Sequence, residues 1–269
     1  MPVNECADNG YCDTHYHEHY PIKCNRDCHV SQNIPYVVQK SIYDERFKGT
    51  MIGGEGHWQK RYDEICHLLQ ISKKDDLESA DHMAAFKNYS EGLLNLAKSN
   101  SNRRFFIIGN GPPKTDISGI YGKGVIIVAD SAIWKIEKPY VPEIIVTDLD
   151  GDVDRILEMS EQGSIVFIHS HGDNIKKLDR FCPLFNGRFI PTTQVPGYRR
   201  IYNFGGFTDG DRAAYIADFL GALSIELVDF DFSIQHGKVW TERKDAKLKI
   251  ARDLLKDLER FRGDKILGL

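Results

Sequence analysis

The sequence predicts an α/β fold: a Rossmann-like, mostly parallel sheet flanked by helices, with a small Cys/His-rich N-terminal module. Short, continuous apolar runs begin after residue 102, as expected for strands buried on both faces. Segments with apolar residues at helical spacing precede and follow these runs. Four of the six cysteines fall within residues 1–28, which marks a separate module. We therefore expect a module over 1–50 and an α/β catalytic domain with an N-terminal helical segment over 51–269.

The composition is typical of a soluble globular protein, with 41% hydrophobic and 28% charged residues. A formal net charge of −4 argues against nucleic acid as the main partner, because it provides no basic field for a phosphate polymer. No apolar run has the length of a membrane span, and the first residues lack the pattern of a secretory signal. We expect a cytoplasmic protein without a membrane partner.

The N-terminal module combines cysteines and histidines at short spacing. In a reducing compartment this mixture favours a metal site over a disulfide framework, and Cys24 and Cys28 have workable spacing for structural Zn²⁺. Free buried thiols with exposed histidines are the alternative. The candidate ligands are Cys6, Cys12, Cys24, Cys28 and His17, with His15, His19 and His29 as further choices.

The helical elements come first in the catalytic domain. Residues 57–98 are predicted to be helical overall, with Ser72 opening a second helix whose N-terminus is favoured by Asp75 and Asp76. A packable helix is expected over 211–223, and a long charged helix with one apolar stripe is expected near the C-terminus.

The predicted strands follow residue 102, and most of them end in Gly, Asp or His. In open parallel sheets ligands bind outside the carboxyl ends of the strands, so these residues are candidates for a site. The apolar runs are 105–108, 125–128, 144–146, 165–168 and 225–228.

The first motif is the loop Gly109, Asn110, Gly111, followed by two prolines. Its glycines allow backbone N–H groups to approach a phosphate. Asp130 lies 21 residues beyond Gly109, the position of the acid that holds a ribose hydroxyl in dinucleotide folds. The third glycine of that fingerprint is missing, and an ordinary strand-to-loop turn explains the motif about as well.

The second motif places Asp148, Asp150 and Asp152 in one turn after an apolar strand. Such acids repel one another unless a cation offsets their charge, and Mg²⁺ with a triphosphate is the natural ligand. A solvated acidic turn is the alternative.

The third motif runs from His169 through His171 and Asp173 to Asn174. No third transition-metal ligand follows nearby, so we expect a substrate-facing segment in which Asp173 is a further Mg²⁺ ligand. His169 is equally well explained as a hydrogen-bonded histidine at a strand end.

The fourth motif, over 203–212, is a glycine-rich loop that enters a helix. Arg212 can form forked bonds to phosphate, and Phe207 can stack on a flat heterocycle. Asp209 and Asp211 could instead cap the helix. Polar residues 192–194 lie just upstream as candidate substrate contacts.

Together, these four motifs resemble those of the archaeal 6-hydroxymethyl-7,8-dihydropterin pyrophosphokinases, over about residues 53–264. That family is similar in catalytic fold to the thiamine pyrophosphokinases. The resemblance implies transfer of diphosphate from ATP to the hydroxymethyl group of a reduced pterin, with release of AMP, in folate or methanopterin biosynthesis. It also implies that Asp148, Asp150 and Asp173 hold Mg²⁺ and that Arg212 completes the catalytic set.

The remaining expected contacts extend this picture. The general base is His171 or one of the aspartates. Residues expected to contact the nucleotide or its cofactor are Gly109, Asn110, Gly111, Asp130, His171, Asn174, Gly205, Gly206, Thr208, Asp209 and Asp211. Further candidates for phosphate contacts are Lys114, Lys176, Arg199 and Arg200.

Three alternatives stay open from the sequence. A metal-dependent glycosyltransferase can also hold a nucleotide sugar through paired acids at a strand end, and a thiamine-type pyrophosphokinase would share the metal chemistry. The third alternative is a zinc-dependent binding module for which the α/β domain is only a scaffold.

Overall fold

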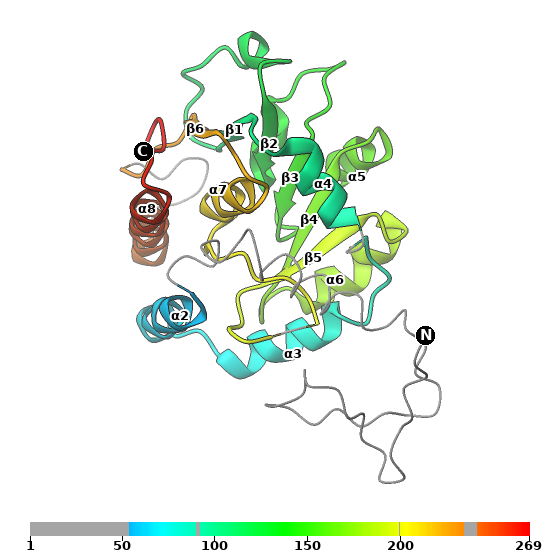
Figure 1. Cartoon of the computed structure of the whole chain (residues 1–269). Helices are drawn as coiled ribbons and strands as arrows, with labels where there is room; N and C mark the ends of the chain where they lie inside the picture. Colours follow the sequence, from blue (N-terminus) through cyan, green and yellow to red (C-terminus); the bar gives the residue numbers. More distant parts are fainter. Residues whose placement is uncertain (1–53, 90–91, 199, 234–240) are drawn as a thin grey trace, which may run out of the picture.

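The computed structural model describes residues 54–89, 92–198, 200–233 and 241–269, and its centre is a six-stranded sheet (Figure 1). All neighbouring strands are parallel, in the order β5-β4-β3-β2-β1-β6. The chain therefore builds the sheet outward from β1 to β5 and then returns to the other side of β1. The strands are β1 (Arg104–Ile108), β2 (Val125–Ala129), β3 (Ile144–Thr147), β4 (Ile165–Ser170), β5 (Phe189–Thr193) and β6 (Ser224–Val228).

The predicted α/β class is confirmed, and the five predicted strands all form. The sheet is entirely parallel, and it contains one strand that the apolar pattern does not reveal. That strand, β5, carries Pro191 and two threonines and lies at the edge of the sheet, where a proline is tolerated. The predicted module over 1–50 lies outside the described residues, as do the candidate zinc ligands Cys6, Cys12, Cys24, Cys28 and His17.

Helices cover both faces of the sheet because alternate strand residues point to opposite sides. Phe105 and Ile107 of β1 pack in the core beneath α2, α4, α7 and α8, whereas Phe106 and Ile108 pack in the second core with α3, α5 and α6. The first group is α2 (Glu55–Leu69), α4 (Leu93–Asn100), α7 (Asp209–Phe219) and α8 (Glu242–Arg262). The second is α3 (Lys73–Met83), α5 (Val153–Glu161) and α6 (Ile175–Phe181), with the 3₁₀ turns η3 (Ile117–Ile120), η4 (Asp130–Lys135) and η5 (Cys182–Phe185).

The predicted helical segments form with adjusted ends. Ser72 caps α3, and its side chain accepts the N–H of Asp75. Helix α7 begins at Asp209 and ends at Phe219, so its start brings an acid to the carboxyl edge of the sheet. No helix in the described part of the chain is long and apolar enough to cross a membrane.

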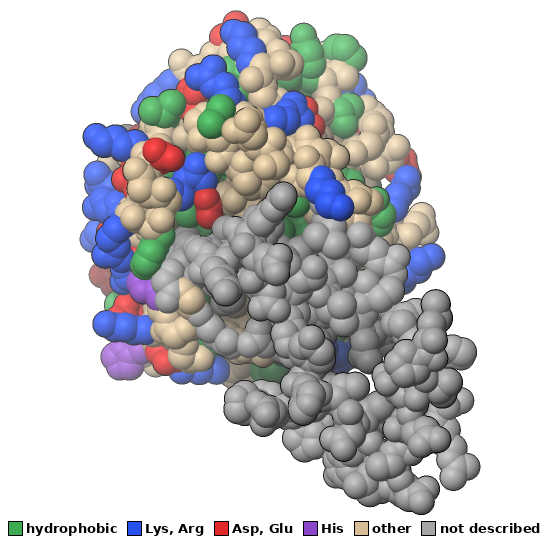
Figure 2. Space-filling view, in the orientation of Figure 1, with side chains coloured by type: hydrophobic (Ala, Val, Ile, Leu, Met, Phe, Trp, Pro, Cys, Tyr) green, Lys and Arg blue, Asp and Glu red, His purple; other side chains and the backbone are tan. Residues whose placement is uncertain are grey.

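Helix α8 is the most basic element of the domain. It contains eight Lys and Arg residues, and in Figure 2 basic side chains gather along the left edge of the view, where Figure 1 places α8. Its apolar stripe, which includes Leu254, Leu255 and Leu258, is buried in the core that α8 shares with α2 and α7.

Three strand ends have backbone conformations that side chains rarely adopt. Asp130 after β2, Leu149 after β3 and Asp229 after β6 have φ values of 36°, 66° and 55°. Such conformations cost free energy and are concentrated at functional sites. All three lie at the carboxyl edge, which is the edge that the sequence motifs share.

Candidate functional site

Three carboxylates from separate elements meet at the carboxyl edge of the sheet. Asp130 follows β2, Asp148 follows β3, and Asp209 begins α7, and one oxygen from each lies within 4.8 Å of the others. Hard cations such as Mg²⁺ prefer carboxylate oxygens. These residues are therefore suited to hold a divalent cation.

The three acids have unequal pKa values. Burial, followed by the charge of Asp148, raises the pKa of Asp130 to about 6, and burial with the charges of Asp148 and Asp130 raises the pKa of Asp209 well above its ordinary value. Burial opposes ionisation of Asp148 as well, but the nearby imidazole of His171, 3.6 Å away, and the charges of Arg212 and Lys177 outweigh it and lower the pKa of Asp148. Asp148 is thus the cluster member that stays ionised most easily.

The strand ends hold these acids through side-chain bonds. Thr147 Oγ1 donates to Asp130 and accepts the N–H of Leu149 at 2.8 Å. A Cβ atom on Gly151 would lie 2.7 Å from Asp130 Oδ2, so any other residue there would push the Asp130 carboxylate out of its place. Asn174 Nδ2 donates to the carbonyl oxygens of Asp148 at 3.1 Å and of His169 at 2.8 Å, and therefore ties the ends of β3 and β4 together.

Arg212 and His169 form a buried pair beside the cluster. Arg212 donates to Asp209 Oδ1 at 3.3 Å, to the Phe207 carbonyl at 2.9 Å and to His169 Nε2 at 3.0 Å. Burial, with the charges of Arg212 and His171, lowers the pKa of His169 well below its ordinary value. Because a guanidinium can only donate, Nε2 of the neutral ring accepts and Nδ1–H donates to Thr192 Oγ1 at 3.0 Å.

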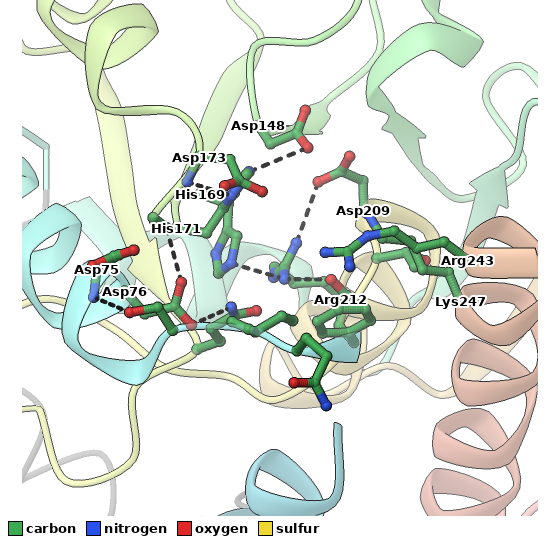
Figure 3. A pocket seen from close by; sticks show the side chains of 17 residues that line it. Asp75, Asp76, Asp148, His169, His171, Asp173, Asp209, Arg212, Arg243 and Lys247 are labelled. Atoms are coloured by element: carbon green, nitrogen blue, oxygen red, sulfur yellow. Dashed lines mark hydrogen bonds and ion pairs between the residues drawn. The ribbon is translucent and has the colours of Figure 1, made fainter. Parts of the chain in front are cut away.

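A pocket of about 340 Å³ opens next to Asp148 and Asp209 (Figure 3). Residues after β4 and β5 and from α3 form one side, and the first turns of α8 supply Arg243 and Lys247. The lining residues are Gln70, Ile71, Ser72, Asp75, Asp76, Asp148, His169, His171, Gly172, Asp173, Gln194, Phe207, Thr208, Asp209, Arg212, Arg243 and Lys247.

A buried network supports the floor of this pocket. Asp76 accepts bonds from the Tyr62 hydroxyl at 2.8 Å, from Gln194 Nε2 at 2.7 Å and from the N–H of Gly172 at 2.8 Å. A Cβ on Gly172 would lie 2.6 Å from Asp75 Cβ, so α3 and the loop after β4 pack closely only because this residue is glycine.

The glycine-rich loop of the fourth motif shapes the approach to α7. Gly205 and Gly206 have φ values of 86° and 78°, and a Cβ on Gly206 would lie 2.4 Å from Arg212 Cα. The carboxylate of buried Asp211 accepts the N–H groups of Phe207 at 2.6 Å and Thr208 at 2.8 Å, completing a capping box. The structure therefore assigns Asp211 to the helix cap, whereas Asp209 lines the pocket.

The first glycine loop packs against the end of β6. A Cβ on Gly109 would lie 2.6 Å from the Phe230 ring, and one on Gly111 would lie 2.3 Å from the Asp229 carbonyl oxygen. Asp229 also accepts the N–H groups of Lys114 and Thr115 and forms a buried ion pair with Lys135 at 2.8 Å.

The exposed side chain of this loop, Asn110, is held between two neighbours. It accepts a bond from Trp134 Nε1 at 2.8 Å and donates to Ser131 Oγ at 3.2 Å. The loop does not line the pocket but lies along the same edge, at β1.

Two predicted Mg²⁺ ligands lie outside the three-acid cluster. Asp150 is half exposed and pairs with Lys177, and Asp173 lines the pocket without joining Asp130 and Asp209. Among the further phosphate candidates, Lys114, Lys176 and Arg200 are exposed outside the pocket lining, and Arg199 is outside the described residues.

Sequence reasoning missed two parts of the site. It treated Asp130 and Asp209 as nucleotide contacts and did not join them to Asp148, although each lies at the end of a strand or the start of a helix at the same edge. It also missed Arg243 and Lys247, whose spacing on a helix gives no signal that they face a pocket.

An all-parallel α/β sheet with clustered carboxylates and basic side chains at its carboxyl edge is typical of enzymes that handle phosphate esters with a divalent cation. The family comparison makes this class specific. Residues 80–237 match the family described as "6-hydroxymethylpterin diphosphokinase MptE-like", and the chain belongs to this family.

Three archaeal relatives agree with the family match, and each is named 6-hydroxymethyl-7,8-dihydropterin pyrophosphokinase. The protein from Methanocaldococcus jannaschii is 32% identical over 231 residues, covering 75% of this chain and 94% of the relative. The Pyrococcus furiosus protein is 34% identical over 228 residues, covering 78% and 96%. The Methanothermobacter thermautotrophicus protein is 36% identical over 181 residues, covering 65% and 77%. The family resemblance of the four motifs is thereby confirmed.

Proposed function

We propose that this protein transfers the diphosphate group of ATP to the hydroxymethyl group of 6-hydroxymethyl-7,8-dihydropterin and releases AMP. Membership of the pterin diphosphokinase family supports this activity, as does the acid cluster beside a polar pocket. Family membership also favours this activity over a glycosyltransferase or a non-catalytic scaffold.

The order of the strand ends suggests how the substrates lie. The glycine loop follows β1, Asp130 and Asp148 follow β2 and β3, and His169, His171 and Gln194 follow β4 and β5. A nucleotide whose AMP end lies at the β1 loop would extend its phosphates past the acid cluster toward the pocket. The pterin would then occupy the pocket, where the half-buried Phe207 ring offers a flat apolar face.

The cation would be held by Asp148 with Asp130 and Asp209. When bound, Mg²⁺ neutralises charge on the phosphate oxygens and favours departure of AMP. Asp150 and Asp173 lie on the same edge and remain predicted ligands. A cation would also offset the repulsion among the three clustered carboxylates. That repulsion contributes to the raised pKa values of Asp130 and Asp209.

In the reaction, the pterin hydroxyl oxygen attacks the β-phosphorus, and the bond from that phosphorus to the oxygen of the α-phosphate breaks. The hydroxyl proton passes to a base in the pocket. Both ring nitrogens of His169 are engaged by Arg212 and Thr192, so His169 is not suited to this role. His171, which lines the pocket 3.6 Å from Asp148, and the pocket carboxylates are the available groups.

The test is a product assay with purified protein, Mg²⁺, ATP and either the reduced pterin or thiamine as acceptor. We expect AMP and the pterin diphosphate in equal amounts, and no turnover with thiamine. Release of ADP would show monophosphate transfer and overturn the proposal. A preference for thiamine would show that the acceptor is wrong while the metal chemistry is right.

A further inference from the structure

Two basic residues of α8 line the pocket and lie one helical turn apart. Arg243 and Lys247 are the only residues of this helix among the pocket-lining set. Figure 3 shows both side chains reaching from α8 toward Asp209 and Arg212. The helix therefore places two cations opposite the strand ends that carry the acids.

These two cations differ from the other basic residues around the site. Arg212 is buried and already donates to Asp209, Phe207 and His169. Within the described ranges Arg243 and Lys247 have no carboxylate partner: Arg243 donates to the Leu69 carbonyl, and Lys247 Nζ lies 5.8 Å from the centroid of the Phe207 ring. Elsewhere on α8, by contrast, Lys249 pairs with Asp245 at 2.7 Å.

We propose that Arg243 and Lys247 bind the β- and γ-phosphates of ATP, which form the diphosphate group that is transferred. This inference rests on the proposed function. A guanidinium suits phosphate oxygens through its forked donors, and an ammonium adds a mobile point charge. Together with a cation at the acid cluster, they would surround the transferred group with positive charge from two sides.

The position of the pair argues for the terminal phosphates rather than the α-phosphate. The strand-end residues in the pocket lining follow β3, β4 and β5, and the glycine loop after β1 is not part of that lining. The AMP half is expected at that loop, so the phosphates farthest from the adenosine reach α8. Arg243 and Lys247 would then also lie close to the pterin acceptor in the pocket.

The test measures the affinity of the full-length protein for Mg²⁺-pyrophosphate, Mg²⁺-ATP and AMP by calorimetry. Lys247→Met is the primary variant, because methionine keeps an apolar stem against Phe207 while removing the charge. We expect about tenfold weaker binding of ATP and of pyrophosphate, the loss typical of one charge-assisted hydrogen bond, and AMP affinity within about twofold of wild type. Lys249→Met is the matched control on the same helix and should leave all three affinities unchanged.

Arg243 is tested with a conservative variant, because its hydrogen bond to the Leu69 carbonyl also ties α8 to the end of α2. Arg243→Lys keeps the charge and loses the forked geometry, and we expect it to weaken pyrophosphate binding without lowering AMP affinity. Wild-type affinities for ATP and pyrophosphate in both Lys247→Met and Arg243→Lys would overturn the inference. Equal weakening of AMP would also overturn it, because the contact would then be to the α-phosphate.

The proposed function is tested separately in the same preparations. If the wild type makes no AMP from ATP and the pterin but Lys247→Met still loses pyrophosphate affinity, the acceptor assignment fails and the phosphate site stands. If the wild type makes AMP and Lys247→Met binds pyrophosphate normally, the function stands and the role of α8 is refuted.

Discussion

Asp148→Asn should lower turnover strongly without weakening the fold. Asp148 offers an oxygen within 4.8 Å of oxygens from Asp130 and Asp209. Two unit charges at that distance repel by about 3 kcal/mol at an effective dielectric constant of about 20. Removing the charge of Asp148 relieves this repulsion, but it also removes the attraction of Asp148 to His171 and Arg212. The attraction between Asp148 and His171 is worth about 1 kcal/mol or less, because the pair is partly exposed.

The net change in the free energy of unfolding is therefore expected between zero and an increase of about 2 kcal/mol in metal-free protein. The melting temperature should stay level or rise by about 2–4 °C per kcal/mol. Turnover should fall on the order of a hundredfold or more, because Mg²⁺ depends on charged oxygen ligands. Added Mg²⁺ should raise the melting temperature of the wild type more than that of the variant.

The assay combines AMP release against Mg²⁺ concentration with thermal unfolding in EDTA and in Mg²⁺. Asp152→Asn is the control, because Asp152 caps α5 by accepting the N–H of Arg155, and asparagine caps a helix equally well. Turnover of Asp148→Asn within about threefold of wild type at saturating Mg²⁺ would refute the metal assignment, since loss of a ligand should cost far more. If Asp148→Asn in EDTA melts several degrees below the wild type, repulsion among the acids does not govern the stability of the metal-free protein.

The remaining predictions concern other residues of the same chain. Turnover should fall far more in Asp209→Asn than in Asp150→Asn, because Asp209 belongs to the acid cluster and Asp150 pairs with Lys177. The reverse order in an AMP-release assay would show that Asp150, and not Asp209, holds the metal together with Asp148. Asp211→Ala should lower the unfolding free energy by about 1–2 kcal/mol through loss of the α7 capping box, measured by urea titration, whereas an unchanged midpoint would show that the cap is dispensable. Asp229→Asn should make the free energy of unfolding depend less on pH in acid. Burial opposes ionisation of Asp229, but hydrogen bonds from Lys135 and two backbone N–H groups outweigh it and lower the pKa of Asp229. The ionised carboxylate therefore stabilises the fold above the unfolded pKa near 4, and this stabilisation is lost as pH falls through the folded pKa. Equal slopes for wild type and variant below pH 4 would contradict this. Finally, the N-terminal Cys and His residues should retain Zn²⁺ through purification, and elemental analysis without zinc, together with unchanged melting after chelation, would remove that site.

Several residues of the candidate site could be predicted from local sequence patterns alone. Asp148, His169, His171 and Arg212 follow recognisable apolar or glycine-rich segments, and parallel strands that end in polar residues place them on one edge. The four motifs also carried the family resemblance, which the family match and three archaeal relatives confirm.

The pattern of apolar runs did not predict two features of the structure, namely strand β5 and the different roles of Asp209 and Asp211. The edge strand β5 does not stand out in the sequence, because Pro191 and two threonines interrupt its apolar run. A proline is tolerated there because β5 lies at the edge of the sheet and β4 is its one neighbouring strand. Asp211 has the same residue type and loop as Asp209, yet one carboxylate caps the helix and the other faces the pocket. These two residues are only two positions apart in the sequence.

The sequence by itself determined the α/β class, five of the strands and the edge on which the acids lie, because apolar runs and turn residues act over a few positions. Only the tertiary structure decided which acids meet. Asp130, Asp148 and Asp209 come from three different elements, and α8 brings Arg243 and Lys247 to the pocket from more than 30 positions beyond Asp209. Such proximity depends on strand order and helix packing, which bring together side chains that no local spacing connects.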